Sequence, residues 1–529
     1  MANKKLERFY GFFYGWLVAF TAAMGGFLFG YEIGIINQVF TMHPFKTTFD
    51  IETYDPNTDT YTKTGDADDI TGWVTFTFLI GAAVGALVVY YPCNMLGRKW
   101  TIMLGGVAFM VGVAMETVAG NIATLYLGRV VAGVGVGFMS CCVPLYIAET
   151  AKTSIRGRLI AVYQFMITIG IFVATCVNSL IIKFYGDSAG DSEWRLAFGL
   201  QFVPCALMLA SLLALPFSPR WLAYVGRDKE ALAVVSKLRG KPDTSEAVLA
   251  EYEEIITAVD EEKAIGEGSW LELFIDPAVR YRTFLAISLQ FLQQWTGINI
   301  ILYFGSDLYA ALGFSEDMAN IGFPLINSAV NMLATLPGMW LIEVIGRKLL
   351  MTVGGVGMAI SLALVCVFGE VGSSQDTLDR LGIGAITFIL VFTIFFAATW
   401  GPVVWVYQSE IFPLRHRAKG NSAGTVSNWT WNAVISKVAP LILADINYYT
   451  YLIFAGACLF MAIFALILCP ETKGLTLEQV EAVFGQSPAA GRANKSSAAA
   501  EVELGELAGE SALSAPPSQR EETDTSAEQ

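Results

Sequence analysis

Residues 13–40 read FYGWLVAFTAAMGGFLFGYEIGIINQVF, an apolar run that contains one acid, Glu32, and no base. A helix that crosses a bilayer needs about 20 mostly apolar residues, so this run is long enough to span a membrane. A carboxylate at membrane depth costs about 2.5–3.5 kcal/mol on insertion scales unless it faces a partner or a wet cavity. We therefore expect Glu32 to line a solute path and to carry a proton; the alternative is a solvated acid at the end of its helix.

The composition of the whole chain is also apolar. Of its 529 residues, 54% are hydrophobic and 15% are charged, whereas soluble domains carry charge on about a quarter of their residues. The apolar runs lack the period-2 alternation of barrel strands. The first run is also too long for a signal-peptide core, and no cleavage site follows it. The sequence predicts an all-α membrane protein with twelve transmembrane helices, near residues 13–37, 71–92, 101–119, 122–146, 158–182, 194–216, 283–310, 318–342, 350–370, 381–408, 420–443 and 448–469.

The net charge of −14 is concentrated in two segments. Residues 38–70 hold seven acids against two bases, and the tail beyond 485 holds eight acids against three bases. Because these acids are local, the charge does not imply nucleic acid as a partner. The eight cysteines lie in or beside apolar runs and the two histidines are far apart. We therefore expect neither a disulfide framework nor a metal site.

Lysine and arginine concentrate on alternate connections between the predicted helices. Bases precede the first helix and follow the second, fourth, eighth and tenth, at Lys4, Lys5, Arg8, Arg98, Lys99, Lys152, Arg156, Arg158, Arg347, Lys348, Arg415, Arg417 and Lys419. Cytoplasmic loops of membrane proteins carry such an excess. We therefore expect both termini in the cytoplasm and the acidic residues 38–70 outside.

Three signals recur in the same order at nearly one spacing. The tripeptide GRK at 97–99 returns at 346–348 after 249 residues, and Glu149 with Arg156 returns as Glu410 with Arg417 after 261. The segment PFSPR at 216–220 returns as PETKG at 470–474 after 254 residues. Two homologous six-helix halves are a common transporter architecture, with the substrate near the midplane. We expect an N-terminal bundle at 1–218, a linker of amphipathic cytoplasmic helices at 219–280, a C-terminal bundle at 281–475 and a largely disordered cytoplasmic tail at 476–529.

Six motifs in one order make a resemblance specific. They are FGYE at 29–32, GR at 128–129 with the glycines that follow, Glu149 through RG at 156–157, QQWTGIN at 293–299, WGP at 400–402 through EIFP at 410–413, and PETKG at 470–474. Over residues 13–480 the chain resembles the sugar porter family of the major facilitator superfamily, and its fungal and plant-type hexose transporters most. The resemblance implies the major facilitator fold, with two six-helix bundles around a central substrate site.

The chain departs from the family pattern at four positions. The acid of the first helix is Glu32 where the family usually has Asp, and Phe217 stands in place of the usual Glu. Asn94 stands where an acid is common, and Lys152 where Pro is common. None of these residues touches the expected sugar site. The departures therefore bear on the regulation of gating more than on the substrate class.

Amides within the apolar runs suit a neutral sugar. Sugar hydroxyls donate and accept hydrogen bonds, and carboxamides do both without the desolvation cost of a charge, while aromatic faces suit the C–H face of a pyranose ring. The resemblance implies a sugar site at Gln164, Gln293, Gln294, Asn299, Asn331, Asn428 and Asn432, with Trp405 and Trp429 as aromatic contacts and Tyr303 with Phe304 as a gate. The alternative is that such amides join helices to each other, which we favour for the lone Asn327.

The spacing of the amides in the seventh helix bears on the shape of that helix. Gln293, Gln294 and Asn299 can face one cavity only if the helix is broken or lines the cavity broadly. Gly297 provides a weak point, and non-helical backbone is tolerated where it lines a cavity. In the tenth helix, we expect Gly401 and Pro402 to break the helix beside Trp405.

Arg129 is the expected partner of Glu32, because a buried arginine needs a counter-charge as much as a buried acid does. The resemblance implies that this acid takes up and releases a proton in coupled transporters. Facilitative members of the family can also carry an acid here, so Glu32 permits coupling without proving it. The resemblance further implies a cytoplasmic gating network that favours the outward-open state, at Arg98, Glu149, Arg156, Arg347, Glu410 and Arg417.

The sequence therefore predicts a plasma-membrane monosaccharide transporter that works by alternating access as a sugar/proton symporter, with glucose as the default hexose. Facilitated diffusion is the alternative, and a sugar sensor that signals through its tail is a more distant one. The sequence has no phosphate-binding motif of an ATP-driven motor. We expect no enzyme activity and no cofactor, and the expected partners are the monosaccharide, the proton and the lipid bilayer.

Overall fold

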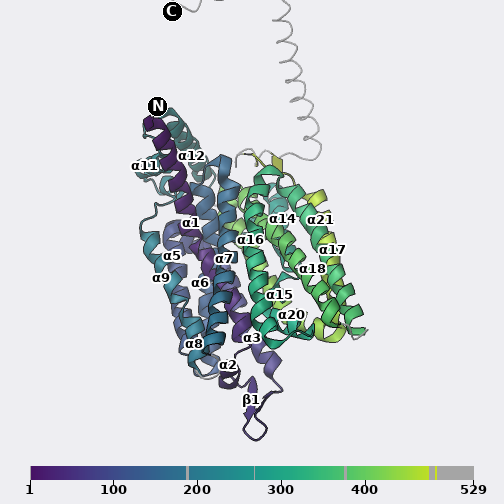
Figure 1. Ribbon diagram of the computed structural model, residues 1–529. Coiled ribbons are helices and arrows are strands. Elements are labelled where there is room, and N and C mark those ends of the chain that lie inside the picture. Colours follow the sequence, from purple (N-terminus) through teal and green to yellow (C-terminus); the bar gives the residue numbers. More distant parts are fainter. Residues whose placement is uncertain are drawn as a thin grey trace, which may run out of the picture. The chain divides into compact units, whose positions relative to one another are not determined.

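Helices make up nearly all of the described chain (Figure 1). The computed structural model describes residues 2–185, 190–266, 268–374, 378–475, 480, 483 and 484. Contacts divide the chain into two units, Met1–Leu477 and Glu478–Gln529, and every helix and strand of Figure 1 belongs to the first. The predicted disordered tail at 476–529 falls almost entirely outside the described residues.

The first set of membrane-length helices comes from the apolar runs before residue 214. It consists of α1 Ala2–Val39, α3 Ala67–Val88, α4 Tyr90–Met95, α5 Gly97–Thr117, α6 Ile122–Thr150, α7 Arg156–Phe184, α8 Ser192–Gly199 and α9 Phe202–Leu213. Helix α6 lies at its centre and packs on α1, α3 and α5. Gly133 and Gly137 of α6 lie so close to α3 that a Cβ atom would collide with the carbonyl oxygens of Phe78 and Ala82. The glycines after Arg129 thus allow close helix packing.

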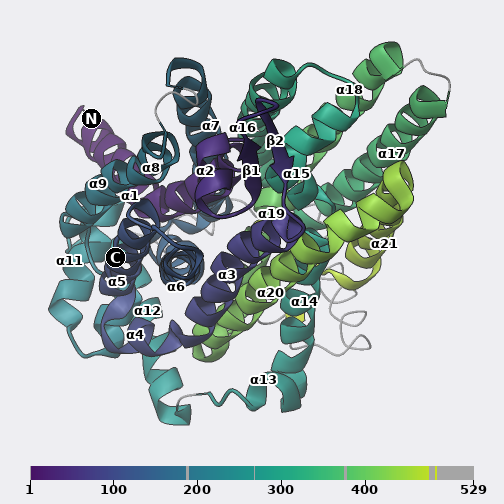
Figure 2. The same ribbon diagram turned by 90° about the horizontal axis from the view of Figure 1, so that it is seen from below.

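The second set begins after residue 276. It consists of α14 Pro277–Gln294, α15 Ile298–Ala311, the π-helical turn η3 Met318–Gly322, α16 Phe323–Val344, α17 Arg347–Ser374, α18 Leu378–Ala398, α19 Trp400–Ile411, α20 Leu414–Ile446, the short turn η4 Asn447–Tyr449 and α21 Thr450–Leu468. Helix α17 packs on α18 and α21, and α14 packs on α20. The two sets meet along α3 with α20 and along α7 with α16, and both pairs are visible in Figure 2. The exact domain boundaries stay a prediction, because contacts keep both sets in one unit.

Ten segments of the described chain are long and apolar enough to cross a membrane. The other two predicted spans, 283–310 and 420–443, correspond to α14 with α15 and to α20. Helix α14 stops at Gln294 before a break, and α20 carries Asn421, Ser422, Asn428 and Asn432 on buried positions. These two spans lack the apolar signal because both contain many polar residues, and the four named on α20 are buried inside the protein.

The acidic connection at 38–70 has more structure than the sequence indicated. It forms α2 His43–Thr48 and an antiparallel hairpin of β1 Glu52–Asp55 and β2 Thr60–Lys63, with Glu52 opposite Lys63. Partial burial of Glu52 opposes its ionisation, but hydrogen bonds from Lys46 and His43, both 2.8 Å, outweigh burial and hold the pKa of this carboxyl below its usual range. We call this end of the molecule the hairpin face.

The connection between the sets forms four helices, α10 Pro219–Tyr224, α11 Asp228–Arg239, α12 Glu246–Ile265 and α13 Glu272–Ile275. Ala231 and Val235 of α11 are buried in an apolar cluster with residues of α10 and α12, and Leu238 of α11 is also buried. This confirms the predicted amphipathic helices. Glu272 connects α13 to the start of α20 through a hydrogen bond with His416 and an ion pair with Arg415. These two partners also hold the pKa of the Glu272 carboxyl below its usual range. We call this end of the molecule the linker face.

Candidate functional site

A central cavity lies between the two sets and encloses about 500 Å³, a volume that includes its opening to solvent. Ligand pockets are typically about 300–1,000 Å³. Eight of the nine expected sugar contacts line it, namely Gln164, Gln293, Gln294, Asn299, Asn331, Trp405, Asn428 and Asn432, whereas Trp429 and the expected gate residues Tyr303 and Phe304 do not. Apolar side chains complete the wall, at Phe29, Ile33, Ile167, Ile171, Ile298, Leu302 and Phe396. The sequence does not mark these apolar residues as cavity lining, because a buried apolar side chain carries no signal that separates cavity wall from core.

The break in the seventh span places three amides around this cavity. Helix α14 ends at Gln294 and α15 begins at Ile298, with Gly297 between them at φ 89°. Asn299 Nδ2 then donates to Gln294 Oε1 over 2.6 Å, and Gln293 Nε2 donates to the Trp400 carbonyl oxygen over 2.8 Å. The predicted break at Gly297 is confirmed.

The break in the tenth span lies earlier than predicted. Helix α18 ends at Ala398 and α19 begins at Trp400, with Thr399 at φ −129° and ψ −87°. Gly401 and Pro402 lie inside the first turn of α19, where proline is tolerated because its missing N–H would have no helical partner. The helix thus breaks just before these two residues, because Pro402 has no N–H to donate to the Ala398 carbonyl oxygen four residues earlier, and the break brings Trp405 to the cavity.

A second layer of amides holds the first in place. Asn428 Nδ2 donates to Gln293 Oε1 over 2.8 Å and to Gln290 Oε1 over 2.6 Å. Gln290 Nε2 donates in turn to Gln408 Oε1 over 2.6 Å. The sequence analysis missed Gln290 and Gln408, although Gln290 precedes Gln293 by three residues and so lies on the same helical face. Asn331 Oδ1 is buried without a hydrogen-bond partner among the described residues and is free to accept from a ligand.

Two predicted contacts lie behind the wall. Trp429 Nε1 donates to Ser140 Oγ over 3.0 Å across the two sets, and its ring packs 4.7 Å from that of Phe29, which lines the cavity. The hydroxyl of Tyr303 donates to Asn432 Oδ1 over 3.3 Å. Neither residue belongs to the cavity lining, so in this conformation both act through a neighbour. Asn327, expected to join helices, accepts a 2.8 Å hydrogen bond from Thr393 Oγ1 between α16 and α18.

Glu32 and Arg129 form an ion pair within the first set. Both side chains are fully or almost fully buried, at 0% and 2% exposure. Arg129 Nε also donates to the Val74 carbonyl oxygen over 3.2 Å, and the guanidinium lies 4.6 Å from the Phe78 ring centroid. The pair lies behind the cavity wall, which α1 reaches through Phe29 and Ile33.

Comparison with known proteins identifies the family. The family model described as "Sugar (and other) transporter" matches residues 18–484. The chain belongs to the sugar porter family of the major facilitator superfamily. Its fold is accordingly the all-α, twelve-helix fold of these transporters.

A hexose transporter and a glucose sensor of yeast are among the relatives of this sugar porter. The high-affinity hexose transporter HXT6 of Saccharomyces cerevisiae is 33% identical over 472 residues, which cover 87% of this chain and 80% of HXT6. The high glucose sensor RGT2 of the same yeast is 33% identical over 485 residues, which cover 89% of this chain but only 61% of the sensor.

Solved structures of one transporter match the fold. The proton:xylose symporter XylE bound to 6-bromo-6-deoxy-D-glucose has a TM-score of 0.77 at 28% identity, and the match covers 90% of this chain and 100% of that one. The inward-open form of XylE from E. coli has a lower TM-score of 0.67 at 26% identity, covering 88% and 99% of the two chains. The sugar porter described here is therefore less similar to the inward-open form.

The linker face of this sugar porter carries the same polar cluster in both halves. Arg98 Nη2 lies 2.9 Å from Glu149 Oε1, and Ser218 Oγ donates to Glu149 Oε2 over 2.5 Å. In the second half, Arg347 Nη2 lies 2.8 Å from Glu410 Oε1, and Thr472 Oγ1 donates to Glu410 Oε2 over 2.9 Å. The three recurring sequence signals thus meet in space as one repeated cluster.

The two clusters differ at one position. Glu471 accepts hydrogen bonds from the backbone N–H groups of Arg347 and Lys348, at 2.9 and 3.0 Å, and so caps the first turn of α17. Its counterpart in the repeat is Phe217, which stacks on Trp221 and lies 5.3 Å from Lys99 Nζ. The first half therefore replaces a charged cap with an aromatic contact.

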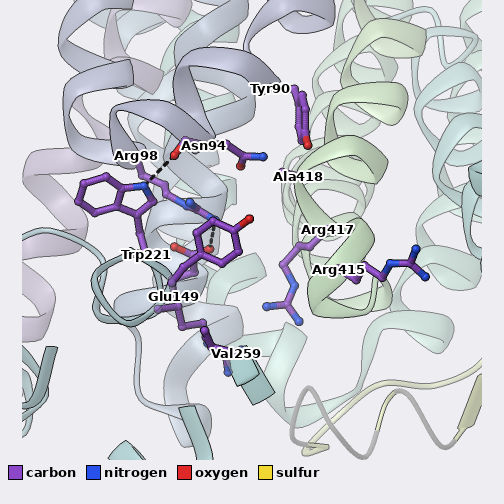
Figure 3. A pocket seen from close by; sticks show the side chains of 11 residues that line it. Tyr90, Asn94, Arg98, Glu149, Trp221, Val259, Arg415, Arg417 and Ala418 are labelled. Atoms are coloured by element: carbon purple, nitrogen blue, oxygen red, sulfur yellow. Dashed lines mark hydrogen bonds and ion pairs between the residues drawn. The ribbon is translucent and has the colours of Figure 1, made fainter. Parts of the chain in front are cut away.

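The remaining residues of the predicted network lie nearby. Arg417 extends from α20 toward the first set across a second cavity at the linker face, whose far wall includes Arg98 and Glu149 (Figure 3). Arg417 Nε and Nη2 both donate to the Phe412 carbonyl oxygen over 3.3 Å. Arg156 is buried at the start of α7. The structure thus gathers the six expected residues at one face of the molecule.

Proposed function

We propose that this sugar porter carries a monosaccharide, most simply the hexose glucose, across the plasma membrane by alternating access. The observation that carries the proposal is the central cavity, where seven amides and one indole from both halves surround one space. Amides of this kind bind an uncharged polyol without the cost of burying a charge. The hexose transporter HXT6 among the relatives supports the same substrate class.

The second part of the proposal is that sugar moves together with a proton. The buried ion pair of Glu32 and Arg129 supplies a carboxyl group that can exchange a proton. Glu32 lies on α1, the helix that lines the cavity through Phe29 and Ile33. The proton:xylose symporter XylE among the structural relatives favours coupling over facilitated diffusion. The basic residues at the linker face favour a cytoplasmic position for that face.

Transport by purified protein in lipid vesicles tests both parts. Labelled glucose is offered outside vesicles with an inward proton gradient, with galactose, fructose and xylose as competitors. The expected result is accumulation above the outside concentration that collapses when a protonophore is added. Uptake that only equilibrates and ignores the protonophore would leave a facilitative transporter, and the absence of any sugar flux would remove the transport proposal.

The glucose sensor RGT2 among the relatives raises a second reading, that of a sugar receptor. The match covers 89% of this chain and 61% of the sensor's own length. Flux in the vesicles described above would exclude a receptor that binds without transporting.

A further inference from the structure

A third charged residue lies beside the buried ion pair. Glu116, near the end of α5, is fully buried at 0% exposure, and its Oε1 lies 3.7 Å from Arg129 Nη1. Neither carboxyl oxygen of Glu116 has a hydrogen-bond partner among the described residues. Gly128, next to Arg129, leaves room for this side chain, because a Cβ there would lie 2.9 Å from Glu116 Cγ. Two carboxyl groups from α1 and α5 therefore share one guanidinium from α6.

The charges of this group do not balance when all three residues are ionised. One positive and two negative charges leave a net charge of −1 among buried side chains, and an uncompensated buried charge is costly. Two carboxyl groups that share a site avoid this cost when one of them holds a proton. With one proton, the group of Glu32, Glu116 and Arg129 is neutral.

Other described residues do not supply the missing positive charge. Arg195 of α8 donates to the Thr117 carbonyl oxygen over 2.8 Å and pairs with Asp191 over 3.1 Å, so its charge is already matched. The other charged residue of α8 is the acid Glu193, and α9 and α4 contain no Asp, Glu, Lys or Arg. On α6 the nearest ionisable neighbour of Arg129 in sequence is Tyr126, and Tyr303 of α15 also faces the guanidinium, but a phenol supplies no positive charge. Helix α3, which packs on α6, carries only the acids Asp68 and Asp69, both in its first turn. The carboxyl groups of Glu32 and Glu116 therefore depend on Arg129 and on each other.

We propose that Glu32 and Glu116 share one proton around Arg129, and that Glu116 is a second proton-binding residue of the transporter. This inference rests on the proposed proton symport. Uptake forms one O–H bond on either carboxylate and release breaks it, so one proton enters from one side and one leaves on the other. The loaded group is neutral and the empty group carries −1. A pair of Glu32 and Arg129 alone would instead be positive when loaded and neutral when empty.

All three residues lie on helices of the first half, and α6 packs on both α1 and α5. Rigid-body rocking of one half against the other leaves their mutual distances unchanged. The proton is therefore switched by access from each side rather than by separation of the three side chains. Phe29 and Ile33 flank Glu32 on α1 and line the sugar cavity, which links the proton site to sugar occupancy.

The pH dependence of uphill uptake tests the proposal. In Glu116→Gln, protonation of Glu32 would leave a net positive charge, so half-maximal uptake should require at least ten times more protons, an acid shift of one pH unit or more. Glu116→Asp keeps a carboxyl group and should keep most of the wild-type profile. Glu193→Gln removes an equally buried acid on α8 and serves as the matched control, with no shift expected. A Glu116→Gln profile that coincides with the wild-type profile would overturn the proposal.

An infrared measurement separates this inference from the symport itself. Purified protein at neutral pH should show the carbonyl stretch of a protonated carboxyl group that is lost in Glu116→Gln and also in Glu32→Gln, because the single remaining carboxyl ionises beside Arg129. A band that survives Glu116→Gln at full intensity would overturn the shared proton whatever the uptake data show. A band that behaves as expected in a protein without uphill uptake would instead retain the shared proton and remove the symport. Retained sugar exchange and a monodisperse elution profile establish that each variant is folded.

Discussion

At the scale of single residues, the central cavity is built from amides whose orientation is already determined. Gln293 is held by the Trp400 carbonyl and by Asn428, and Gln294 is held by Asn299. A hydrogen-bonding group that is fixed before a ligand arrives loses less conformational entropy on binding. Asn331 Oδ1, which lacks a partner among the described residues, offers an acceptor to the ligand.

Gln294→Ala should raise the KM for sugar by about tenfold or more, because the loss of a buried hydrogen bond costs about 1–3 kcal/mol. Initial rates of uptake at varied sugar concentration measure this. Asn327→Ala is the matched control, since Asn327 is a buried amide that bonds Thr393 and does not line the cavity. An unchanged KM in Gln294→Ala would remove this residue from the sugar site.

At neutral pH, Glu32→Gln should abolish uphill accumulation and leave sugar exchange in place. The amide has nearly the size of the carboxyl group and keeps α1 packed, but it cannot take up a proton, and the remaining carboxyl group of Glu116 stays ionised beside Arg129. Accumulation under a proton gradient and counterflow of labelled sugar without a gradient measure the two properties separately. Accumulation that survives the substitution would show that Glu32 is not the coupling residue.

At the scale of elements, breaks in two helices direct polar groups into one cavity that a straight helix would turn in different directions. A continuous helix would turn Gln293, Gln294 and Asn299 toward different directions, since successive residues lie about 100° apart. The break at 295–297 lets α14 and α15 each present amides to the same space. The break at Thr399 lies beside Trp400 and Gly401, whose carbonyl oxygens both accept hydrogen bonds from Gln293 Nε2.

Gly297→Ala should lower the thermal unfolding midpoint in detergent by several degrees. The residue has φ 89°, where an L-residue costs about 1–2 kcal/mol, and a Cβ would also lie 3.1 Å from the Phe454 ring. Gly456→Ala on α21 is the control, because that glycine is helical with open space around its Cβ position. It should leave the midpoint unchanged or raise it. Equal midpoints for the two variants would argue against a strained break at Gly297.

At the scale of the whole molecule, contacts bridge the two halves at both ends. On the hairpin face, Gln38 Nε2 donates to the Asn320 carbonyl oxygen over 3.0 Å, and the Ser306 N–H donates to Asn37 Oδ1 over 3.4 Å. Toward the linker face, Ser422 Oγ donates to the Ala86 carbonyl oxygen over 2.5 Å. Alternating access requires these two groups of contacts to break in turn, so their balance determines which side of the cavity opens.

Glu410→Ala should shift this balance toward opening at the linker face. Glu410 orients Arg347, which reaches the other half: a Cβ at Gly157 of α7 would lie 2.6 Å from Arg347 Nη2. The substitution leaves Arg347 buried without its partner, and breaking a buried ion pair costs about 3–5 kcal/mol. Spin labels at the exposed positions Met95 and Leu349 report the separation of the halves, as the label-to-label distance measured by pulsed electron paramagnetic resonance. The expected result is a longer distance population in Glu410→Ala.

Glu230→Ala is the control for that experiment. It removes an exposed ion pair with Arg227 on α11, and exposed pairs contribute little. The label distances should stay as in the wild type. An unchanged distribution in Glu410→Ala as well would mean that the cluster around Glu410 does not hold the linker face closed.

The amino-acid sequence was sufficient for the twelve spans, the repeat and most of the cavity. Apolar length and helical periodicity are local properties, and in a bilayer they leave few alternatives to a helix. The family resemblance placed Arg98, Glu149, Arg347 and Glu410 in one network, and the structure pairs Arg98 with Glu149 and Arg347 with Glu410. The sequence indicated the weak point at Gly297 because only glycine adopts a left-handed backbone conformation without strain.

Tertiary structure alone decided which polar side chains meet. Trp429 and Tyr303 lie behind the cavity wall, Gln290 and Gln408 support it, and Glu116 reaches the guanidinium that the sequence had assigned to Glu32. A lone acid in an apolar run marks a residue that needs a partner, but it does not name the partner. The partner depends on how helices far apart in the chain rotate and pack, and no local pattern encodes that rotation.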